Sequence, residues 1–516
     1  MNTRMIRYLL SIILLIEAVL LLPPLIVAKI YKESLTPFLI PIVILLLISL
    51  PAVFIKPYNT KIYAKDGFVC VASAWILMSV FGAFPFVFSG AIPNFISAFF
   101  ETASGLTTTG ASILTEIESL PRGILFWRSF THWIGGMGVL VFMLAILPLA
   151  GGQTMHLMRA EVPGPTKGKL VPKMKDSAMI LYGIYIALTL MLAVILLICG
   201  QPLYHALVNA FATAGTGGFS VLNNSIAGYN SPIVEWVIAI FMLLFGINFN
   251  LYYFMLIGHF KEIRKNEELR VFLAIVFLST VAISINTAKM FTNLGDCIRT
   301  AFFQVTTIIS TAGFATADFD LWPTFSKTLL VFLMLIGSCA GSTAGGLKLS
   351  RVMLIFKSTV REIRHILRPR SVSIVRLDGV AVPEETVRSA VGYLALYVMM
   401  LICTVFLISF DGYSFETNFT AAIACLNNIG PGLKEVGPTG NFAGYSMLSQ
   451  FLLALSMILG RLEIIPMLVL LSPDTWKKIF GQKESAKIRK LQRIQRLSSS
   501  DRAEKRIKNK KIKPKQ

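Results

Sequence analysis

Long apolar runs separated by short polar clusters make up most of the chain. Runs of about 20 apolar residues have the length that a helix needs to cross a hydrocarbon core of roughly 30 Å. The first two runs, 8–29 and 38–55, are joined by a short turn that we place at Pro23, Pro24 and Lys32. We expect two spanning helices here. The first is too long for a signal peptide and lacks a small-residue cleavage site, so we expect it to be retained.

From Gly67 onward one pattern occurs four times. A long apolar segment is followed by a short one, a glycine turn and a second long segment. The four copies are 67–89, 94–106, Gly110 and 123–149; 178–199, 203–214, Gly218 and 232–258; 270–290, 296–309, Gly313 and 324–356; and 388–409, 416–426, Gly430 and 443–471. The short segments cannot span a bilayer, so they predict half-length helices. A fixed internal period is typical of a repeat architecture.

This pattern predicts an all-α polytopic membrane protein. Ten transmembrane helices follow from two spanning helices per unit and two in front, with four pseudo-symmetric helix–pore-loop–helix repeats around one pore. The expected parts are two N-terminal transmembrane helices at 1–66, pore repeats at 67–150, 178–260, 270–370 and 388–472, and a basic tail at 476–516.

The basic residues predict the orientation of these helices. Only 15% of the residues are charged, and the mean hydropathy is +0.70. The loops between the long segments are basic, with Arg159, Lys167, Lys169, Lys173 and Lys175, then Lys261, Arg264, Lys265 and Arg270, then Arg351, Lys357, Arg361, Arg364, Arg368, Arg370 and Arg376. Lys and Arg collect on the cytoplasmic side of membrane proteins. We therefore place these loops and both chain ends in the cytoplasm, and we expect the four glycine turns to enter from outside.

The net charge of +21 would suggest nucleic acid as the partner of a soluble protein. In a membrane protein the anionic cytoplasmic leaflet of the lipid bilayer is the better explanation, and we expect no nucleic-acid partner. Residues 477–516 contain sixteen of the Lys and Arg residues against three acids. This tail is expected to lie in solvent near anionic lipid, with docking to a partner protein as the alternative.

The four glycine turns have the chemistry of a monovalent-cation filter. Non-helical backbone is tolerated at membrane depth where it is buried in protein or lines a wet cavity. Each half-length helix directs the negative end of its dipole at its turn, and carbonyl oxygens there can replace the water shell of a cation. No turn contains a carboxylate, which disfavours a divalent-cation site. The expected filter residues are Thr108, Thr109 and Gly110; Thr216, Gly217 and Gly218; Thr311, Ala312 and Gly313; and Asn428, Ile429 and Gly430.

An ordinary glycine loop is the alternative for any single turn, and four copies at matching positions argue against it. A second feature, the run of ten small residues at 337–346, interrupts a long apolar segment. Glycine in a helix costs about 1 kcal/mol, so the run predicts a helix break that forms a loop. A close crossing of two helices through small residues is the alternative. The residues assigned to this gate are Gly337, Gly341, Gly345, Gly346 and Lys348, which is placed to steady the loop or to lie near the pore.

Arg461 lies in the last long apolar segment. A charge in a spanning helix is costly and is expected to face a pore or a partner. Residues two apart do not share a helix face, so we do not expect an Arg461–Glu463 pair. We expect Glu463 to meet a basic group on a neighbouring helix instead. An arginine that extends to the cytoplasmic interface is the alternative.

Over about 67–472 the chain resembles the Trk/Ktr/HKT superfamily of potassium transporters, and the two extra N-terminal helices make it most similar to the Trk-type membrane subunits. The stretches that carry the resemblance are Thr108-Thr109-Gly110-Ala111, Gly217-Gly218-Phe219-Ser220, Thr311-Ala312-Gly313-Phe314, Asn428-Ile429-Gly430-Pro431, and Phe126-Trp127-Arg128 leading into Trp133-Ile134-Gly135-Gly136-Met137-Gly138.

The resemblance implies a function and a set of partners. Four units would surround one pore, and a glycine at position 110 rather than a serine would favour potassium over sodium. The 337–346 loop would be the gate, and Arg461 would project into the pore. Such proteins work in the bacterial inner membrane as homodimers with a cytosolic nucleotide-binding ring, TrkA in the Trk case. Potassium would be the transported ion, and this chain would bind no nucleotide, since it has no soluble domain large enough and no G-x-G-x-x-G motif.

Two other classes of function were weighed. Secondary transporters coupled to sodium or protons also use broken helices, but they tend to contain two inverted repeats rather than four parallel ones. An intramembrane enzyme would need a nucleophile with its base, an H-E-x-x-H motif or paired aspartates, and the apolar segments contain none of these. We therefore expect no enzymatic activity.

Overall fold

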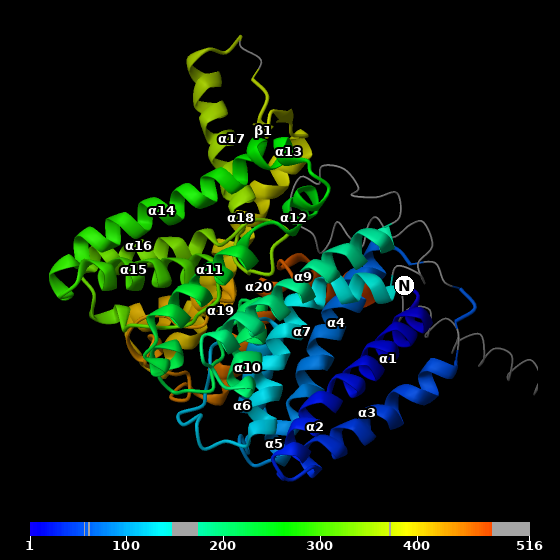
Figure 1. Ribbon diagram of the computed structural model, residues 1–516. Coiled ribbons are helices and arrows are strands. Elements are labelled where there is room, and N and C mark those ends of the chain that lie inside the picture. Colours follow the sequence, from blue (N-terminus) through cyan, green and yellow to red (C-terminus); the bar gives the residue numbers. More distant parts are fainter. Residues whose placement is uncertain (56, 60–61, 147–173, 371–372, 477–516) are drawn as a thin grey trace, which may run out of the picture.

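The computed structural model describes the chain except for residues 56, 60–61, 147–173, 371–372 and 477–516. The described part is almost entirely helical (Figure 1). It contains one small antiparallel sheet, in which β1 (Arg376–Leu377) pairs with β2 (Val380–Ala381). The basic residues predicted at 159–173, and the tail beyond Trp476, lie outside the described residues.

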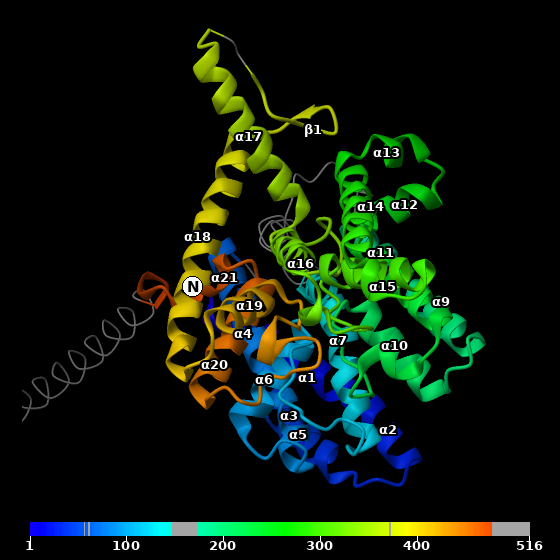
Figure 2. The ribbon, with the colours of Figure 1, turned by 90° about the vertical axis from the view of Figure 1, so that its left-hand side faces the viewer.

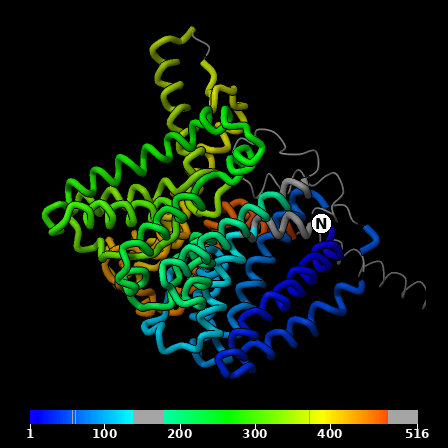
Figure 3. The backbone as a smooth tube through the Cα atoms, viewed as in Figure 1, coloured from blue at the N-terminus to red at the C-terminus, as the bar shows by residue number. Residues whose placement is uncertain are grey.

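Three helices precede the repeated pattern: α1 (Thr3–Leu20), α2 (Leu22–Ile30) and α3 (Thr36–Phe54). The predicted turn is confirmed at Lys32, which has a positive φ of 59°, and is wrong at Pro23 and Pro24. These prolines lie in the first turn of α2, where a missing N–H leaves no helical hydrogen bond unmade. The chain reverses at 31–35 instead, and the three helices lie along one side of the molecule (Figure 3), packed on α4 and α7.

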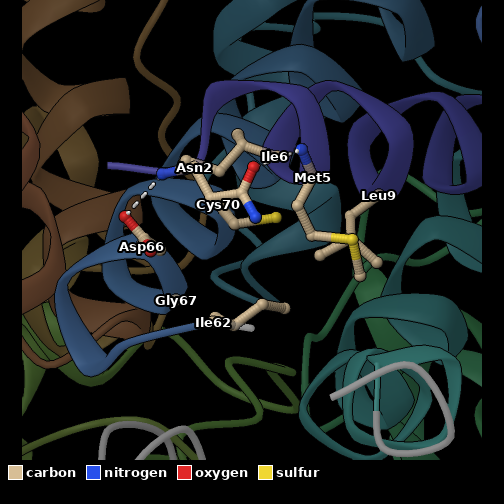
Figure 4. A pocket seen from close by; sticks show the side chains of 8 residues that line it. All are labelled: Asn2, Met5, Ile6, Leu9, Ile62, Asp66, Gly67 and Cys70. Carbon is tan, nitrogen blue, oxygen red and sulfur yellow. Dashed lines mark hydrogen bonds between the residues drawn. The ribbon is translucent and has the colours of Figure 1, made fainter. Parts of the chain in front are cut away.

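The beginning of α1 is attached to the beginning of α4. The Asn2 backbone N–H donates to Asp66 Oδ1 at 3.3 Å, and the Asn2 side chain donates to the Asn59 carbonyl at 2.7 Å. Asp66 lies in the first turn of α4 and is buried. Figure 4 shows this bond beside a small cavity lined by Met5, Ile6, Leu9, Ile62 and Cys70. The chain therefore starts at the same end of the molecule as the loop that leads into α4.

The remaining helices form four units, and each unit has an outer helix, a half-length helix and an inner helix. Unit one is α4 (Ala64–Gly82) with α5 (Phe84–Phe88), α6 (Phe95–Leu106) and α7 (Arg122–Ile146). Unit two is α9 (Met174–Ile198), α10 (Leu203–Ala214), and α11 (Pro232–Gly246) with α12 (Phe249–Leu256). Unit three is α14 (Glu267–Thr287), α15 (Leu294–Ile309), and α16 (Thr324–Ile336) with α17 (Leu349–Leu367). Unit four is α18 (Glu384–Ile408), α19 (Phe415–Asn427), and α20 (Met447–Arg461) with α21 (Ile465–Leu471).

Short elements connect these helices. They are α13 (Phe260–Lys265) and the 3₁₀ turns η2 (Ser225–Tyr229), η3 (Ala288–Met290), η4 (Phe319–Leu321), η5 (Ser409–Asp411) and η6 (Lys434–Val436). In Figures 1 and 2, the far end of α17 projects away from the helical body, whereas the sheet lies near the start of α14, whose Glu267 N–H donates to Asp378 Oδ1 at 2.6 Å. Arg361 on this projection donates to Glu384 at 2.6 Å, and its bonds to Glu384 and Glu362 raise the pKa of its guanidinium.

The half-length helices α6, α10, α15 and α19 contain 12, 12, 16 and 13 residues. At about 1.5 Å per residue they are too short to cross a core of roughly 30 Å. Three of them start at a side-chain cap. Asn94 accepts from the Ile96 N–H, Asn293 from Gly295, and Ser414 from Thr417. Polar caps inside apolar sequence therefore set where these helices begin.

The units close into a ring. Each inner helix packs against the half-length helix of the next unit, α7 on α10, α11 on α15 and α16 on α19, and α20 of unit four packs on α6 of unit one. A linear array would leave the last of these contacts unmade. The polytopic helical fold with four related units around one centre agrees with the sequence prediction.

The inner helices of units two and four are not continuous, so the predicted helices 232–258 and 443–471 are wrong in that respect. In unit two, α11 and α12 meet at an angle of 91°, and the Asn248 side chain starts α12 by accepting from the Asn250 N–H. In unit four, Glu463 and Ile464 have positive φ values of 59° and 64° and separate α20 from α21. Among the described residues six helices are long and apolar enough to span, or seven with α11 and α12 counted together, so the count of ten stays a prediction.

Candidate ion pore

The four glycine turns (107–112, 215–220, 310–316 and 427–432) have the same backbone. Two residues before the common glycine, Thr108, Thr216, Thr311 and Asn428 have φ values of 57°, 54°, 58° and 56°. Gly110, Gly218, Gly313 and Gly430 follow with φ values of 83°, 78°, 77° and 96°. Left-handed backbone therefore occurs at the same two positions in every turn.

The same hydrogen bond ends each half-length helix. The residue before the glycine donates its N–H to the carbonyl five residues earlier, as in the helix terminations that use a left-handed residue. The bonds are Thr109 to Ser104 at 2.8 Å, Gly217 to Ala212 at 2.9 Å, Ala312 to Thr307 at 2.8 Å and Ile429 to Ala424 at 3.0 Å.

Threonine is a poor residue for left-handed backbone, because its branched side chain costs on the order of 1–3 kcal/mol there. Side-chain bonds hold the turns in place. Thr216 Oγ1 donates to the Gly215 carbonyl at 2.6 Å, and Asn428 Nδ2 donates to Thr109 Oγ1 at 2.9 Å. Thr311 Oγ1 accepts the Gly345 N–H at 2.8 Å. Two of these bonds leave the turn and connect it to another unit or to the 337–346 loop.

The four turns touch in a closed cycle. A Cβ placed on Gly110 would lie 1.9 Å from the Gly217 carbonyl oxygen, and one on Gly218 would lie 2.1 Å from that of Ala312. The cycle continues at 2.2 Å from Gly313 to the Ile429 oxygen and closes at 2.9 Å from Gly430 to the Thr109 oxygen. Each glycine thus leaves room for the carbonyl of the next turn, and eight of the twelve predicted filter residues form this cycle. The other four, Thr108, Thr216, Thr311 and Asn428, are the left-handed residues of the same turns.

The predicted break in unit three is present. Helix α16 ends before Gly337, α17 begins at Leu349, and Gly337, Gly341, Gly346 and Lys348 have positive φ values between 70° and 80°. The loop lies against turns three and four, since Gly345 donates to Thr311 and a Cβ on Gly345 would lie 2.4 Å from the Asn427 carbonyl oxygen.

Unit two holds the other side of this loop through its own helix break. The Cys339 N–H donates to the Gly246 carbonyl at 3.3 Å, and the Phe249 N–H donates to the Gly341 carbonyl at 3.0 Å. The loop is therefore joined to the α11–α12 bend by backbone bonds in both directions.

Two charged side chains from unit three hold the loop as well. Glu268 of α14, which is buried, accepts from the N–H groups of Ala340 at 2.7 Å and Ser350 at 3.1 Å. Lys348 Nζ donates to the Ala344 carbonyl within the loop. Sequence reasoning missed Glu268, although a carboxylate at the start of an apolar helix is a usable signal.

Arg461 connects the loop to unit one. It is the last residue of α20, and it donates through Nη1 to the Thr343 carbonyl at 2.8 Å and through Nη2 to the Gly135 carbonyl of α7 at 2.7 Å. Glu463 pairs with Arg351 of α17 rather than with Arg461, as expected from their spacing. The six residues assigned to the gate thus lie in one contact network with the turns.

A pair of buried charges behind the turns was not predicted. Glu101 of α6 and Arg128 of α7 form an ion pair of 2.6 Å with side-chain exposures of 0% and 3%. The signal in the sequence for this pair is an acid within a short apolar helix, together with the arginine of the Phe126-Trp127-Arg128 motif. The residues that the structure describes contain no group of three or more His, Cys, Asp and Glu that could hold a metal ion.

Comparison with known proteins identifies relatives of this chain. A family model described as "TrkH: Cation transport protein" matches residues 37–478. The Trk system potassium uptake protein TrkH of Salmonella typhimurium is 38% identical over 426 residues, which cover 81% of this chain and 87% of that protein. TrkG of Escherichia coli, also a Trk system potassium uptake protein, is 34% identical over 92% of this chain and its own full length.

Comparison with a solved structure gives the same family. The crystal structure of the potassium transporter TrkH from Vibrio parahaemolyticus superposes with a TM-score of 0.83 at 31% identity, covering 92% of this chain and all of that chain. By sequence and by structure, this chain belongs to the TrkH family of cation transport proteins.

Proposed function

We propose that this chain is the pore-forming subunit of a Trk-type potassium uptake system in a bacterial inner membrane. Its family is one of cation transport proteins, and the relatives that it resembles are potassium uptake proteins. The observation that carries the proposal is the closed contact cycle of the four glycine turns. A ring of backbone carbonyls without carboxylates suits a monovalent cation that gives up its water.

In this mechanism potassium exchanges its water shell for carbonyl oxygens of the four turns. The half-length helices direct the negative ends of their dipoles at the ring, which lowers the energy of a cation there. Thr109, Gly217, Ala312 and Ile429, whose oxygens lie at the contacts between turns, bring a carbonyl from each of the four sides.

The 337–346 loop and Arg461 form the gate. The loop lies against turns three and four, and its small residues allow backbone movement that larger side chains would restrict. Arg461 adds a positive charge that opposes a cation leaving the ring. Movement of the loop away from Thr311 and Arg461 opens the path.

The chain acts as a homodimer with a cytosolic, nucleotide-binding regulatory subunit similar to TrkA, and it binds no nucleotide itself. The basic projection formed by α17 and the basic tail are the proposed docking surfaces, and both chain ends lie in the cytoplasm. The sequence similarity to Trk system proteins supports this proposed assembly.

Rubidium uptake into liposomes that contain the purified chain, with and without a TrkA-like subunit, tests the proposal. We expect uptake that potassium inhibits and sodium does not. Changing Gly110 to Ser is expected to weaken this preference, because a side chain there meets the Gly217 carbonyl. Repeating the assay with the membrane potential clamped separates passive flux from coupling to protons or sodium. Absence of potassium-dependent uptake under all these conditions would refute the proposal.

A further inference from the structure

An ion pair stands behind the first two turns and outside the ring of carbonyls. Arg128 Nε lies 2.6 Å from Glu101 Oε1, and both side chains are almost completely buried. Glu101 is on the half-length helix of unit one, and Arg128 is on the inner helix of the same unit.

The acid holds turn one. Glu101 accepts from the Ser112 hydroxyl at 3.0 Å and from the Ile113 N–H at 3.0 Å. Ser112 comes two residues after Gly110, so these bonds fix the chain where it leaves the ring. Hydrogen bonds to an ionised acceptor are shorter and stronger than neutral ones.

Arg128 binds turn two. Arg128 Nη1 donates to the Ser220 carbonyl at 3.0 Å, and the guanidinium carbon lies 3.6 Å from the centre of the Phe219 ring. Ser220 comes two residues after Gly218, which is the position that Ser112 occupies in turn one. The ion pair therefore joins equivalent points of two neighbouring turns across the boundary between units.

The other units have no such pair at these positions. Nine residues before the glycine, where unit one has Glu101, the remaining units have Asn209, Gln304 and Ala421. Gln304 makes the same kind of contact without a charge, because it donates to the Ala317 carbonyl at 3.3 Å beyond turn three. The bridge from one turn to the next is thus particular to units one and two.

We propose that Glu101 and Arg128 are a positioning pair that fixes the spacing between turns one and two and thereby sets the discrimination between potassium and sodium. This inference rests on the proposed filter function. A smaller ion such as sodium is stabilised in the ring only if the carbonyls move inward to contact it. The pair opposes that movement because it holds both turns from behind. Buried ion pairs add little net stability relative to apolar residues, so the pair is better explained by geometry than by folding.

The test uses a double variant, Glu101→Gln with Arg128→Met, which removes both charges so that no buried charge is left unpaired. The amide that replaces the carboxylate can still accept from Ser112, whereas the link to Ser220 is lost. In liposomes we expect the ratio of rubidium to sodium uptake to fall roughly tenfold, the size of effect for losing charge-assisted hydrogen bonds. Sodium uptake should be maintained or increased, which a merely unfolded protein would not show.

A matched control is Glu235→Gln with Arg299→Met. This pair also joins two helices, at 2.7 Å between α11 and α15, and Arg299 pairs with Asp296 of α15 as well. Within the part of the chain that the structure describes, neither Glu235 nor Arg299 has a hydrogen bond to the four turns. Removal of this pair should leave the uptake ratio unchanged. A fall in the ratio equal to that of the Glu101–Arg128 double variant would refute the inference.

The single variant Arg128→Lys keeps the charge but not the planar group that reaches Glu101 and Ser220 together. We expect a ratio of rubidium to sodium uptake between those of the wild type and the double variant. If the double variant does not fold, this variant alone tests the positioning role. A wild-type ratio in a folded Arg128→Lys or double variant would overturn the positioning role. If the wild-type chain itself does not discriminate, the proposed filter function fails instead, so the two failures are distinguishable.

Discussion

The four units are alike in the ring of turns and unlike in the inner helices next to it. In the ring, four units that share little sequence adopt one backbone, with the same left-handed positions and the same terminal hydrogen bond. The inner helices differ in every unit. Helix α7 runs on to Ile146, α11 bends into α12 by 91°, residues 337–348 form a loop, and α20 stops at Arg461.

Under the proposed function, this contrast separates ion selection in the ring from gating at the loop. A site that replaces the water shell of an ion needs equivalent oxygen ligands on all sides, so each unit must supply the same carbonyls. A gate needs only one element that moves, and the neighbouring units are then shaped to hold it. Bonds from the α11–α12 bend, Glu268, Thr311 and Arg461 to the loop fit this view. Changes in the ring should therefore alter which ion passes, and changes at the loop should alter how fast it passes.

The largest effect is expected from adding a methyl group to the ring. Gly218→Ala places a Cβ 2.1 Å from the Ala312 oxygen, and backbone on both sides cannot move away cheaply. We expect potassium uptake to fall about 100-fold, which corresponds to ~3 kcal/mol, and sodium uptake to fall less, so that the preference for potassium is lost. Gly430→Ala, with a distance of 2.9 Å, should be the mildest of the four changes. Rubidium uptake by the four variants measures this order.

Gly90→Ala is the matched control for that series. Gly90 has a positive φ of 75° but no atom within 4 Å of an added Cβ, so this variant carries only the backbone cost of about 1 kcal/mol. Uptake should stay near the wild-type rate. Equal loss in Gly90→Ala and Gly218→Ala would show that backbone conformation, and not contact between turns, explains the effect.

The next largest effect is expected at Arg461. Arg461→Gln removes the positive charge and keeps one amide group, which can donate to one of the two carbonyls, Thr343 or Gly135, that Arg461 bonds. We expect the initial rate of rubidium uptake to rise about tenfold, equivalent to ~1.4 kcal/mol, with the preference for potassium over sodium unchanged. Arg461→Lys, which keeps the charge, should remain slow. A changed ion preference in Arg461→Gln would contradict the division between ring and loop.

A smaller effect on rate is expected at Thr311. Thr311→Val removes the acceptor of the Gly345 N–H, at a cost of about 1 kcal/mol, the net contribution of a typical hydrogen bond. The loop should open more often, which hydrogen exchange at 337–346 would measure as lost protection. Thr216→Val is the matched control, because this hydroxyl donates within its own turn. Equal exchange in the two variants would argue against the link between turn three and the loop.

Local signals in the sequence were enough to predict the turns and one helix break. The half-length helix predicted at 203–214 has those bounds, and ten small residues in an apolar segment indicated the loop at 337–346. Both features depend on residues close together in the chain, namely a short apolar run followed by glycine. The transport roles given to these residues stay predictions.

Features that depend on contacts between units could not be predicted in the same way. The bend at Asn248 and the positive φ of Ile464 interrupt apolar sequence that reads as one helix, and tertiary contacts override that local preference. The pairing of Glu101 with Arg128 joins two helices, and the cycle of glycine contacts joins four units. A single sequence gives the residue types at such contacts but not which residues meet.

The smallest effect is expected at Glu17, which lies in α1 outside both regions. It is 1% exposed, and neither carboxylate oxygen has a hydrogen-bond partner in the described part of the chain. An unpaired ionised group at this depth would cost several kcal/mol, so we expect a neutral acid. Glu17→Gln should therefore leave the thermal unfolding temperature and both uptake ratio and rate unchanged. Glu101→Gln alone should lower the unfolding temperature, because it leaves Arg128 buried without its counter-charge. If Glu17→Gln instead changed the uptake ratio, a charge remote from the ring would be tuning ion choice, and the separation of tasks argued from the turns and the loop would not hold.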